Sequence, residues 1–496
     1  MTTPSAPLKS IPIRVLASLM LIRGGYGLTL GLYLYVNQVV LLDALERTGV
    51  GEAMRLSIST WVLAFVVFWI ALMEYPTGVV GDLFGRRLAM TTGFVFRGLF
   101  FAAFLGVWAV GRWPVHVGDI PPSVWVVVTV AVSWVLFGIG YGLLSGTVTA
   151  WLNDSLDEAG CYNRFAAALA WGHLAYWVTF LVGSLVALLL YNARLPQVLF
   201  LLGLFTSLTV AVLCALTTGE NKFYQFRRLG DVFGQARKKM AAEYAAIWRA
   251  GRQVFMADVW RFGAITLVGA AIHTLRDFID YSWVTYCKDQ RVLALDGNEG
   301  IASFGRLTWL VLALTVVYLV GHTAVLALIR RWEVGGREVT GRRLVGLNIG
   351  LNLLFSLPVL GLFVGMTFLV APGTNAGFLV FAVLIALYAF FQGASDSPRE
   401  SLDNAYIPAR TQERASVLSL IEVLRKMIAA VVIFALGFVV NTSEAMLWAW
   451  AVLTVAVVAL TLALPAAMRG QYAAPADGSG NGEALNGYPA NDNRGS

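Results

Sequence analysis

The stretch MEYPTGVVGDLFGRRL, residues 73–88, places charged and turn-forming residues between two apolar segments. Residues 61–73 carry no charged side chain, and the chain becomes apolar again at Leu88. A hairpin in a soluble protein does not need two such apolar flanks. The pattern indicates a short turn at a membrane surface, between two helices that each cross the bilayer.

The composition of the whole chain supports a membrane protein. Of its 496 residues, 58% are hydrophobic and only 13% are charged, against roughly 25% charged residues in soluble domains. The mean hydropathy is +0.71. The three cysteines, Cys161, Cys214 and Cys287, are far apart and have neither disulfide nor metal spacing. We therefore expect them to be packing residues, and we expect no metal and no cofactor.

Apolar runs of spanning length occur six times in each half of the chain. The predicted spans are 13–36, 59–80, 88–110, 123–151, 165–191, 197–217, 259–286, 306–329, 343–370, 376–395, 415–440 and 444–468. The first run is too long for a cleavable signal peptide, so it is predicted to be a spanning helix. The resulting fold class is an all-α polytopic membrane protein with 12 transmembrane helices.

The spans divide the chain into five regions. These are a cytoplasmic N-terminus (1–12), an N-terminal six-helix bundle (13–218), a basic linker (219–258), a C-terminal six-helix bundle (259–468) and a tail predicted to be disordered (469–496). Lysine and arginine gather in every second loop, which predicts that those loops and both termini are cytoplasmic. The net charge of +7 is therefore a topology signal, and we expect no nucleic-acid partner.

The opening stretch has a counterpart in the second half of the chain. GDLFGRR, residues 81–87, aligns with REVTGRR, residues 337–343, so that Gly85-Arg86-Arg87 matches Gly341-Arg342-Arg343. The two loops are six predicted helices apart. Six helices repeated in the same orientation indicate a parallel repeat about an axis along the membrane normal.

The loop pattern Gly78-x-x-x-Asp82-x-x-Gly85-Arg86-Arg87 resembles the signature between the second and third spans of the major facilitator superfamily. SGTVTAWLNDSL (145–156) and NAYIPARTQERASVLSL (404–420) are similar to that group as well. The resemblance implies alternating access between two six-helix bundles. It also implies that the loop is a gate, for which we hypothesise that Asp82 forms a latch with Arg414.

The loop also has a purely structural interpretation. Small residues let the two helices approach closely at a short turn. A carboxylate at position 82 favours the positive end of the following helix. The two arginines can meet lipid headgroups and keep the turn on the cytoplasmic side.

Four charged or titratable side chains share one face of the seventh span. At 100° per residue, His273, Arg276, Asp277 and Asp280 lie within an arc of about 100°. Arg276 and Asp280 are four residues apart and can pair on the helix surface. The stripe is interpreted either as a neutralised structural network or as a proton site in which an aspartate holds Arg276 until it is protonated. Glu74 is a further coupling candidate, or a structural partner of Arg97.

Polar side chains on other spans are candidates for substrate binding. An arginine can bind an anionic group through two hydrogen bonds, and tyrosines supply a ring with a hydroxyl group. The candidates are Arg23, Tyr26, Tyr33 and Asn37 in the first span, Tyr141, Ser145 and Thr149 in the fourth, and His273 in the seventh. Each set can instead serve pairing or helix packing. Glu422, Arg425 and Lys426 share a face of the eleventh span, and the expectation there is snorkelling toward the membrane surface.

The predicted function is secondary active transport of a small amphipathic organic solute across the cell inner membrane by a monomer, with protons as the coupling ion. Basic residues within the spans slightly outnumber acidic ones, which favours an anion. Proton antiporters of the superfamily often carry an arginine in the fourth span, and many of its exporters carry a proline in the fifth. This chain has neither, which weighs against an efflux antiporter for lipophilic cations. That function stays open as an alternative. A sensor or assembly protein without transport and a lipid-modifying membrane enzyme are further alternatives. HExxH, GxSxG and GxxxxGK[ST] are absent, so no enzyme is expected.

Overall fold

A computed structural model of the chain describes residues 11–113, 119–161, 165–219, 259–289, 301–334, 341–371, 374–406 and 411–467, with single positions between 238 and 256. Within these ranges some side chains lie outside the description, among them those of 78–80, 82–84, 341–344, 396–406 and 411–419. The linker and tail predicted from the sequence fall largely outside the described residues.

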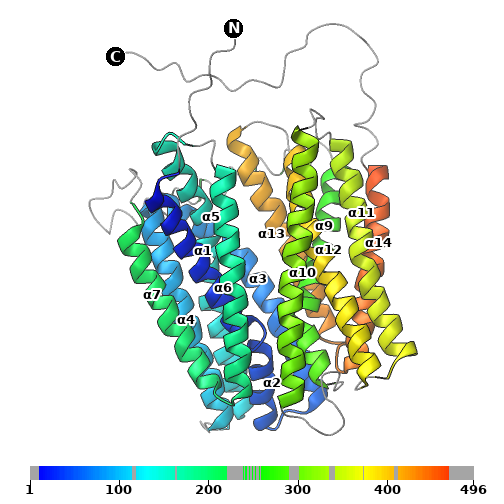
Figure 1. Ribbon diagram of the computed structural model, residues 1–496. Helices are drawn as coiled ribbons and strands as arrows, with labels where there is room; N and C mark the ends of the chain where they lie inside the picture. The colour runs from blue at the N-terminus through cyan, green and yellow to red at the C-terminus, as the bar shows by residue number, and fades with distance from the viewer. Residues whose placement is uncertain are drawn as a thin grey trace, which may run out of the picture.

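The described part of the chain consists of long helices arranged side by side (Figure 1). Their bounds are α1 Ile13–Leu34, α2 Asn37–Arg47, α3 Glu52–Phe84, α4 Arg86–Arg112, α5 Pro122–Glu158, α6 Phe165–Asn192, α7 Pro196–Thr217, α9 Val259–Asp289, α10 Ile301–Val334, α11 Gly341–Val364 with the π-helical turn η2 Gly365–Leu369, α12 Asn375–Tyr406, α13 Thr411–Leu436 and α14 Ser443–Ala467. Each of the twelve predicted spans coincides with one long helix, and the all-α polytopic fold class is confirmed.

Eleven of these helices are long and apolar enough to cross a membrane, with α1 and α2 counted together as one 35-residue span. The remaining long helix is α13, which carries the charged residues Glu422, Arg425 and Lys426. The chain is therefore an integral membrane protein. The first span is longer than predicted: helix α1 breaks at Tyr35–Val36 and continues as α2, so Asn37 begins a second helix.

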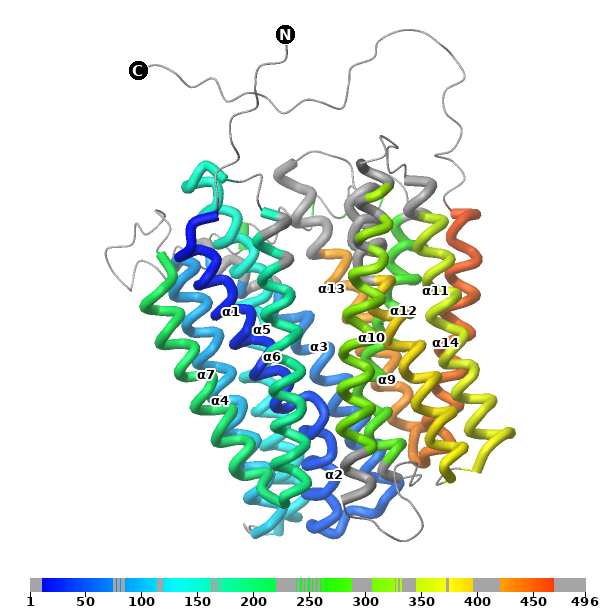
Figure 2. The backbone as a smooth tube through the Cα atoms, in the orientation of Figure 1, coloured from blue at the N-terminus to red at the C-terminus, as the bar shows by residue number. Residues whose placement is uncertain are grey.

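The helices form two groups, α1–α7 and α9–α14, which lie on the left and right of Figure 2. The face at which α1 begins and α14 ends is called here the terminal face, and the other end of the molecule the opposite face. Each group has its own buried apolar core, and a few residues of α2 and α3 join the core of the second group. Two six-helix bundles thus meet along a central seam.

Glycines let the helices of each bundle approach to backbone contact. A β-carbon at Gly27 or Gly31 of α1 would collide with the main-chain oxygen of Tyr176 or Phe180 on α6. In the second bundle, Gly321 of α10 and Gly393 of α12 pack in the same way. Small residues are the usual means of close helix packing in membranes, where apolar burial alone gives little drive for association.

The turn quoted at the start of the sequence analysis joins two helices through one residue. Helix α3 ends at Phe84, α4 begins at Arg86, and Gly85 between them has φ = 94°. This left-handed conformation favours glycine because it has no β-carbon. The matching position in the repeat, Gly341, is the first residue of α11.

Aromatic side chains join the bundles along the seam. Toward the opposite face, Trp61 of α3 lies 5.1 Å from Phe438 and Tyr35 lies 5.8 Å from Trp283, measured between ring centroids. Toward the terminal face, Trp177 of α6 lies 4.6 Å from Tyr318 of α10. The space between these contacts holds the candidate site.

Candidate functional site: a cavity between the bundles

A cavity of about 440 Å³ lies on the seam between the two bundles. Helices α1, α3, α5 and α6 line one side of it, and α9, α10, α12 and α13 line the other. Nine aromatic side chains contribute to its wall: Tyr35, Tyr141, Tyr176, Trp177, Phe180, Tyr281, Trp283, Tyr318 and Tyr388. A concave, mostly apolar site with a few polar groups is typical of small-molecule binding.

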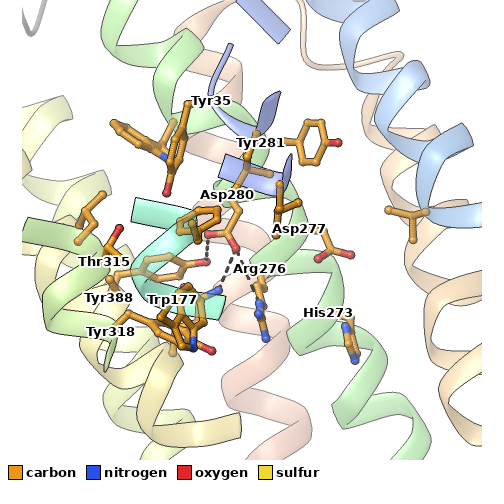
Figure 3. Close-up of a pocket in the computed structure, with 18 of the residues that line it drawn as sticks. Tyr35, Trp177, His273, Arg276, Asp277, Asp280, Tyr281, Thr315, Tyr318 and Tyr388 are labelled. Carbon is orange, nitrogen blue, oxygen red and sulfur yellow. Dashed lines mark hydrogen bonds and ion pairs between the residues drawn. The ribbon is translucent and has the colours of Figure 1, made fainter. Parts of the chain in front are cut away.

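The carboxylate of Asp280 lies in the cavity wall and is held by three side chains (Figure 3). It accepts hydrogen bonds from Tyr388 Oη at 3.1 Å and Gln392 Nε2 at 2.8 Å. Arg276 Nε lies 3.7 Å from the same carboxylate, so the pair expected from the four-residue spacing is present. Neutral donors and one cation together offset the cost of holding a charge away from water.

A second set of charged side chains, unlike the one around Asp280, includes residues from both bundles. Lys426 Nζ of α13 donates to Glu74 Oε2 of α3 at 2.6 Å and lies 3.8 Å from Glu422. Glu422 in turn accepts from His273 Nε2 at 3.1 Å and lies 3.6 Å from Arg425. This set, called here the seam network, ties the two bundles together through the bond between Lys426 and Glu74.

The structure corrects two expectations about these charges. Arg425 and Lys426 do not snorkel: Arg425 is only 2% exposed and Lys426 lines the central cavity. The residue that pairs with Glu74 is Lys426, not Arg97, because Glu74 faces the second bundle. Arg97 lies inside the first bundle, where it donates to Thr29 Oγ1 at 3.0 Å and stacks over the Tyr26 ring.

Most of the predicted substrate residues of the first and fourth spans lie elsewhere in the first bundle. Tyr141 and His273 line the cavity, whereas Arg23, Tyr26, Tyr33, Asn37, Ser145 and Thr149 do not. Arg23 donates to Thr149 Oγ1 at 3.2 Å. Tyr33 is 2% exposed and packs against Phe100 and Phe137. The polar stripe of α1 therefore faces neighbouring helices of its own bundle, whereas Asn37 at the start of α2 interacts with Tyr281 of α9 in the cavity wall.

The predicted gating loop is described in part. Arg86 lies 3.2 Å from Asp154, which ties the start of α4 to the end of α5, and Arg87 follows it in the first turn of α4. Gly78 lies within α3. The side chains of Asp82 and Arg414 are outside the described residues, so the latch between them stays a hypothesis.

Apart from Tyr141, the aromatic wall was missed in the sequence, and so was Gln392. Tryptophan and tyrosine are common in membrane helices, so no single ring stands out in a hydropathy pattern. Gln392 in YAFFQGA, residues 388–394, carried a signal: an uncharged polar side chain inside an apolar span usually faces a cavity or a partner. Here that partner is Asp280.

Solved structures similar to the chain are membrane transporters. The POT family transporter PepTSo matches with a TM-score of 0.65 and 12% identity, over 93% of this chain and 99% of its own. The xylose transporter XylE from E. coli, in a partially occluded inward-open conformation, matches with a TM-score of 0.61 and 15% identity, over 90% and 97% of the two chains. The nucleoside transporter NupG matches with a TM-score of 0.60 and 13% identity, over 92% and 99%.

At these identities the likeness concerns the fold. No family model matches the sequence, and no curated protein matches it either. The structural likeness extends over nearly the whole length of this chain and of each of these transporters. The protein has the fold of major facilitator-type transporters.

Proposed function

We propose that the protein is a secondary transporter that moves a small organic solute by alternating access. The observation that carries this proposal is the cavity on the seam, which both bundles line with charged and aromatic side chains. Aromatic contacts between the bundles lie on each side of it, at Tyr35–Trp283 and at Trp177–Tyr318. Rocking of one bundle against the other can open either set of contacts while the substrate stays bound between them.

Proton coupling is the second part of the proposal. The Asp280–Arg276 pair and the seam network both hold carboxylates against cations beside the cavity. Protonating Asp280 removes the charge that holds Arg276, and protonating Glu74 removes the charge-assisted bond between the bundles. The second event weakens a contact that holds the two bundles in the present arrangement, which is how proton binding can shift a two-state equilibrium. The first event frees Arg276 within α9.

The proposed location is the cell inner membrane, with both termini in the cytoplasm. Its support is the basic character of the loops at the terminal face. In this orientation the Gly85 turn lies on the cytoplasmic side. The gate formed by Gly78, Asp82, Gly85, Arg86, Arg87 and Arg414 then controls the cytoplasmic entrance.

The test of alternating access uses one cysteine in the cavity wall. Thr315 of α10 lines the cavity and is 6% exposed. In a variant with the three native cysteines replaced by alanine, Thr315→Cys is treated with a membrane-impermeant maleimide in sealed vesicles of each orientation. We expect modification from both membrane faces, because the cavity opens to each side in turn.

Ser207→Cys in the same background is the control, because Ser207 is fully buried in α7, away from the cavity. We expect no modification there from either face. Modification of position 315 from only one face contradicts transport and favours the sensor, because a receptor needs one entrance only.

A further inference from the structure

Asp277 differs from the other acidic residues of the cavity in having no partner among the side chains that the structure describes. It lines the cavity on α9, between His273 and Tyr281 one turn away on either side. Figure 3 shows its carboxylate directed away from the bonded group around Asp280. None of the described side chains forms a hydrogen bond or an ion pair with it.

Among the described side chains, the charges around the cavity cancel without Asp277. Three carboxylates (Glu74, Glu422 and Asp280) face three cations (Lys426, Arg425 and Arg276) within the described contacts. His273, one turn before Asp277, is bonded to Glu422. Asp277 is therefore the excess charge of the site, and it is negative. An unpaired carboxylate inside the membrane is costly, which makes it a candidate functional group.

The rest of the wall suits a cation that carries apolar surface. Nine aromatic rings line the same cavity, and the negative face of an aromatic ring attracts an ammonium group. The predicted preference for anions rested on a count over all spans. Around the cavity the count is reversed, since Asp277, Asp280 and Glu422 outnumber Arg276 and Lys426 in its wall. Arg23 and Arg97 lie within the first bundle and do not line it.

We propose that the cavity binds an organic cation with an apolar or aromatic body, and that Asp277 is its counter-ion. The proposal deepens the transport function above and rests on it. The ammonium group pairs with the free carboxylate of Asp277, and the aromatic wall surrounds the body of the molecule. The Asp280–Arg276 pair stays intact when the substrate binds.

Three probes of one skeleton test the sign of the charge. Benzyltrimethylammonium, benzylsulfonate and benzyl methyl sulfone share a benzyl group and a tetrahedral head, and they carry a positive, a negative and no charge. Binding to the purified full-length protein in detergent is measured by equilibrium dialysis of the labelled compounds. We expect the ammonium probe to bind most tightly of the three.

Asp277→Asn is expected to lower the binding affinity for the ammonium probe roughly tenfold to hundredfold, because it removes one charge-assisted contact. It should change binding of the neutral sulfone little. Asp277→Glu should keep most of the affinity. Asp43→Asn is the matched control, because it removes one negative charge from an exposed ion pair with Arg47, away from the cavity.

The proposal is overturned by any of three results: tighter binding of the sulfonate, equal ammonium affinity in wild type and Asp277→Asn, or no ammonium binding. Failure of this proposal is distinguishable from failure of the transport function. Modification of Thr315→Cys from both faces needs no ligand, so alternating access can hold while the substrate class is wrong.

Discussion

At the scale of single residues, the contact between Lys426 and Glu74 joins the bundles by a 2.6 Å bond in a largely buried position. Removing one member of a buried pair leaves an uncompensated charge, which costs about 3–5 kcal/mol. We expect Lys426→Met, which leaves the Glu74 carboxylate alone, to lower the thermal unfolding midpoint of the purified protein markedly. Glu74→Gln should lower it less, because Lys426 keeps Glu422 at 3.8 Å. The double variant should recover most of the loss, because it leaves neither charge alone.

Asp43→Asn provides the control, because its pair with Arg47 is exposed and such pairs contribute roughly 0–1 kcal/mol. If both single variants at the seam unfold at the wild-type temperature, the bond does not stabilise this state. A double variant as unstable as the sum of the two singles would show that they do not interact.

Asp280 has a different role, since its pairing partner lies on the same helix. Asp280→Asn keeps an oxygen for Tyr388 and Gln392 but removes the charge that holds Arg276. In proteoliposomes we expect this variant to lose accumulation of labelled benzyltrimethylammonium driven by a pH gradient, while counterflow exchange persists. Accumulation equal to wild type would exclude Asp280 from coupling. Gln392→Leu is the companion variant, because it removes a neutral donor and leaves both charges.

How far the site could be predicted differs from residue to residue. The stripe on α9 follows from helical periodicity and the Arg276–Asp280 spacing, both local properties of one segment. The partner of Glu74 lies 352 positions away on the other bundle, and no local pattern determines which helix faces it. For the same reason, Arg23, Tyr26 and Tyr33 of the first span were assigned to the cavity although α1 turns that face toward its own bundle.

At the scale of helices, the contact of α1 with α6 depends on glycine. A β-carbon at Gly27 would collide with the main-chain oxygen of Tyr176, and backbone cannot move aside as a flexible side chain can. We expect Gly27→Ala to lower the unfolding free energy by about 1–3 kcal/mol, measured as a drop in the thermal midpoint. Gly146→Ala in α5 is the control: its β-carbon meets open space, and alanine favours helix by roughly 1 kcal/mol. Equal midpoints for the two variants would contradict the packing argument.

The positions of the helices were largely predictable because apolar length alone identifies a membrane span. The points at which helices break within a span were not predictable. Helix α1 ends and α2 begins within LYLYVNQVV, residues 32–40, which contains neither glycine nor proline. The break therefore depends on how the two segments pack, with Tyr35 turned toward Trp283 and Tyr33 held among phenylalanines. The turn at Gly85 was predicted as a short loop with small residues, whereas its one-residue length and left-handed conformation come from the structure.

At the scale of the whole molecule, transport by rocking requires the bundles to separate at one face while they stay together at the other. Trp61 of α3 and Gly437, just after α13, touch across the seam toward the opposite face. A β-carbon at Gly437 would lie 3.1 Å from Trp61 Cγ. This brings the two positions within reach of the roughly 3.5–4.5 Å β-carbon separation of a disulfide. Trp61→Cys with Gly437→Cys should therefore form a disulfide that closes the opposite face.

With this disulfide formed, Thr315→Cys should react with the impermeant maleimide from the terminal face and no longer from the opposite face. Mass spectrometry of the peptide that contains position 315 separates this reaction from any at positions 61 and 437. Reduction should restore access from both faces, because the bundles can then separate on either side. Trp61→Cys without the second cysteine is the control and should keep both routes open. Reaction from the opposite face with the disulfide intact would show that the cavity opens there by a path other than the Trp61–Gly437 seam, and rigid rocking of the two bundles would then be wrong.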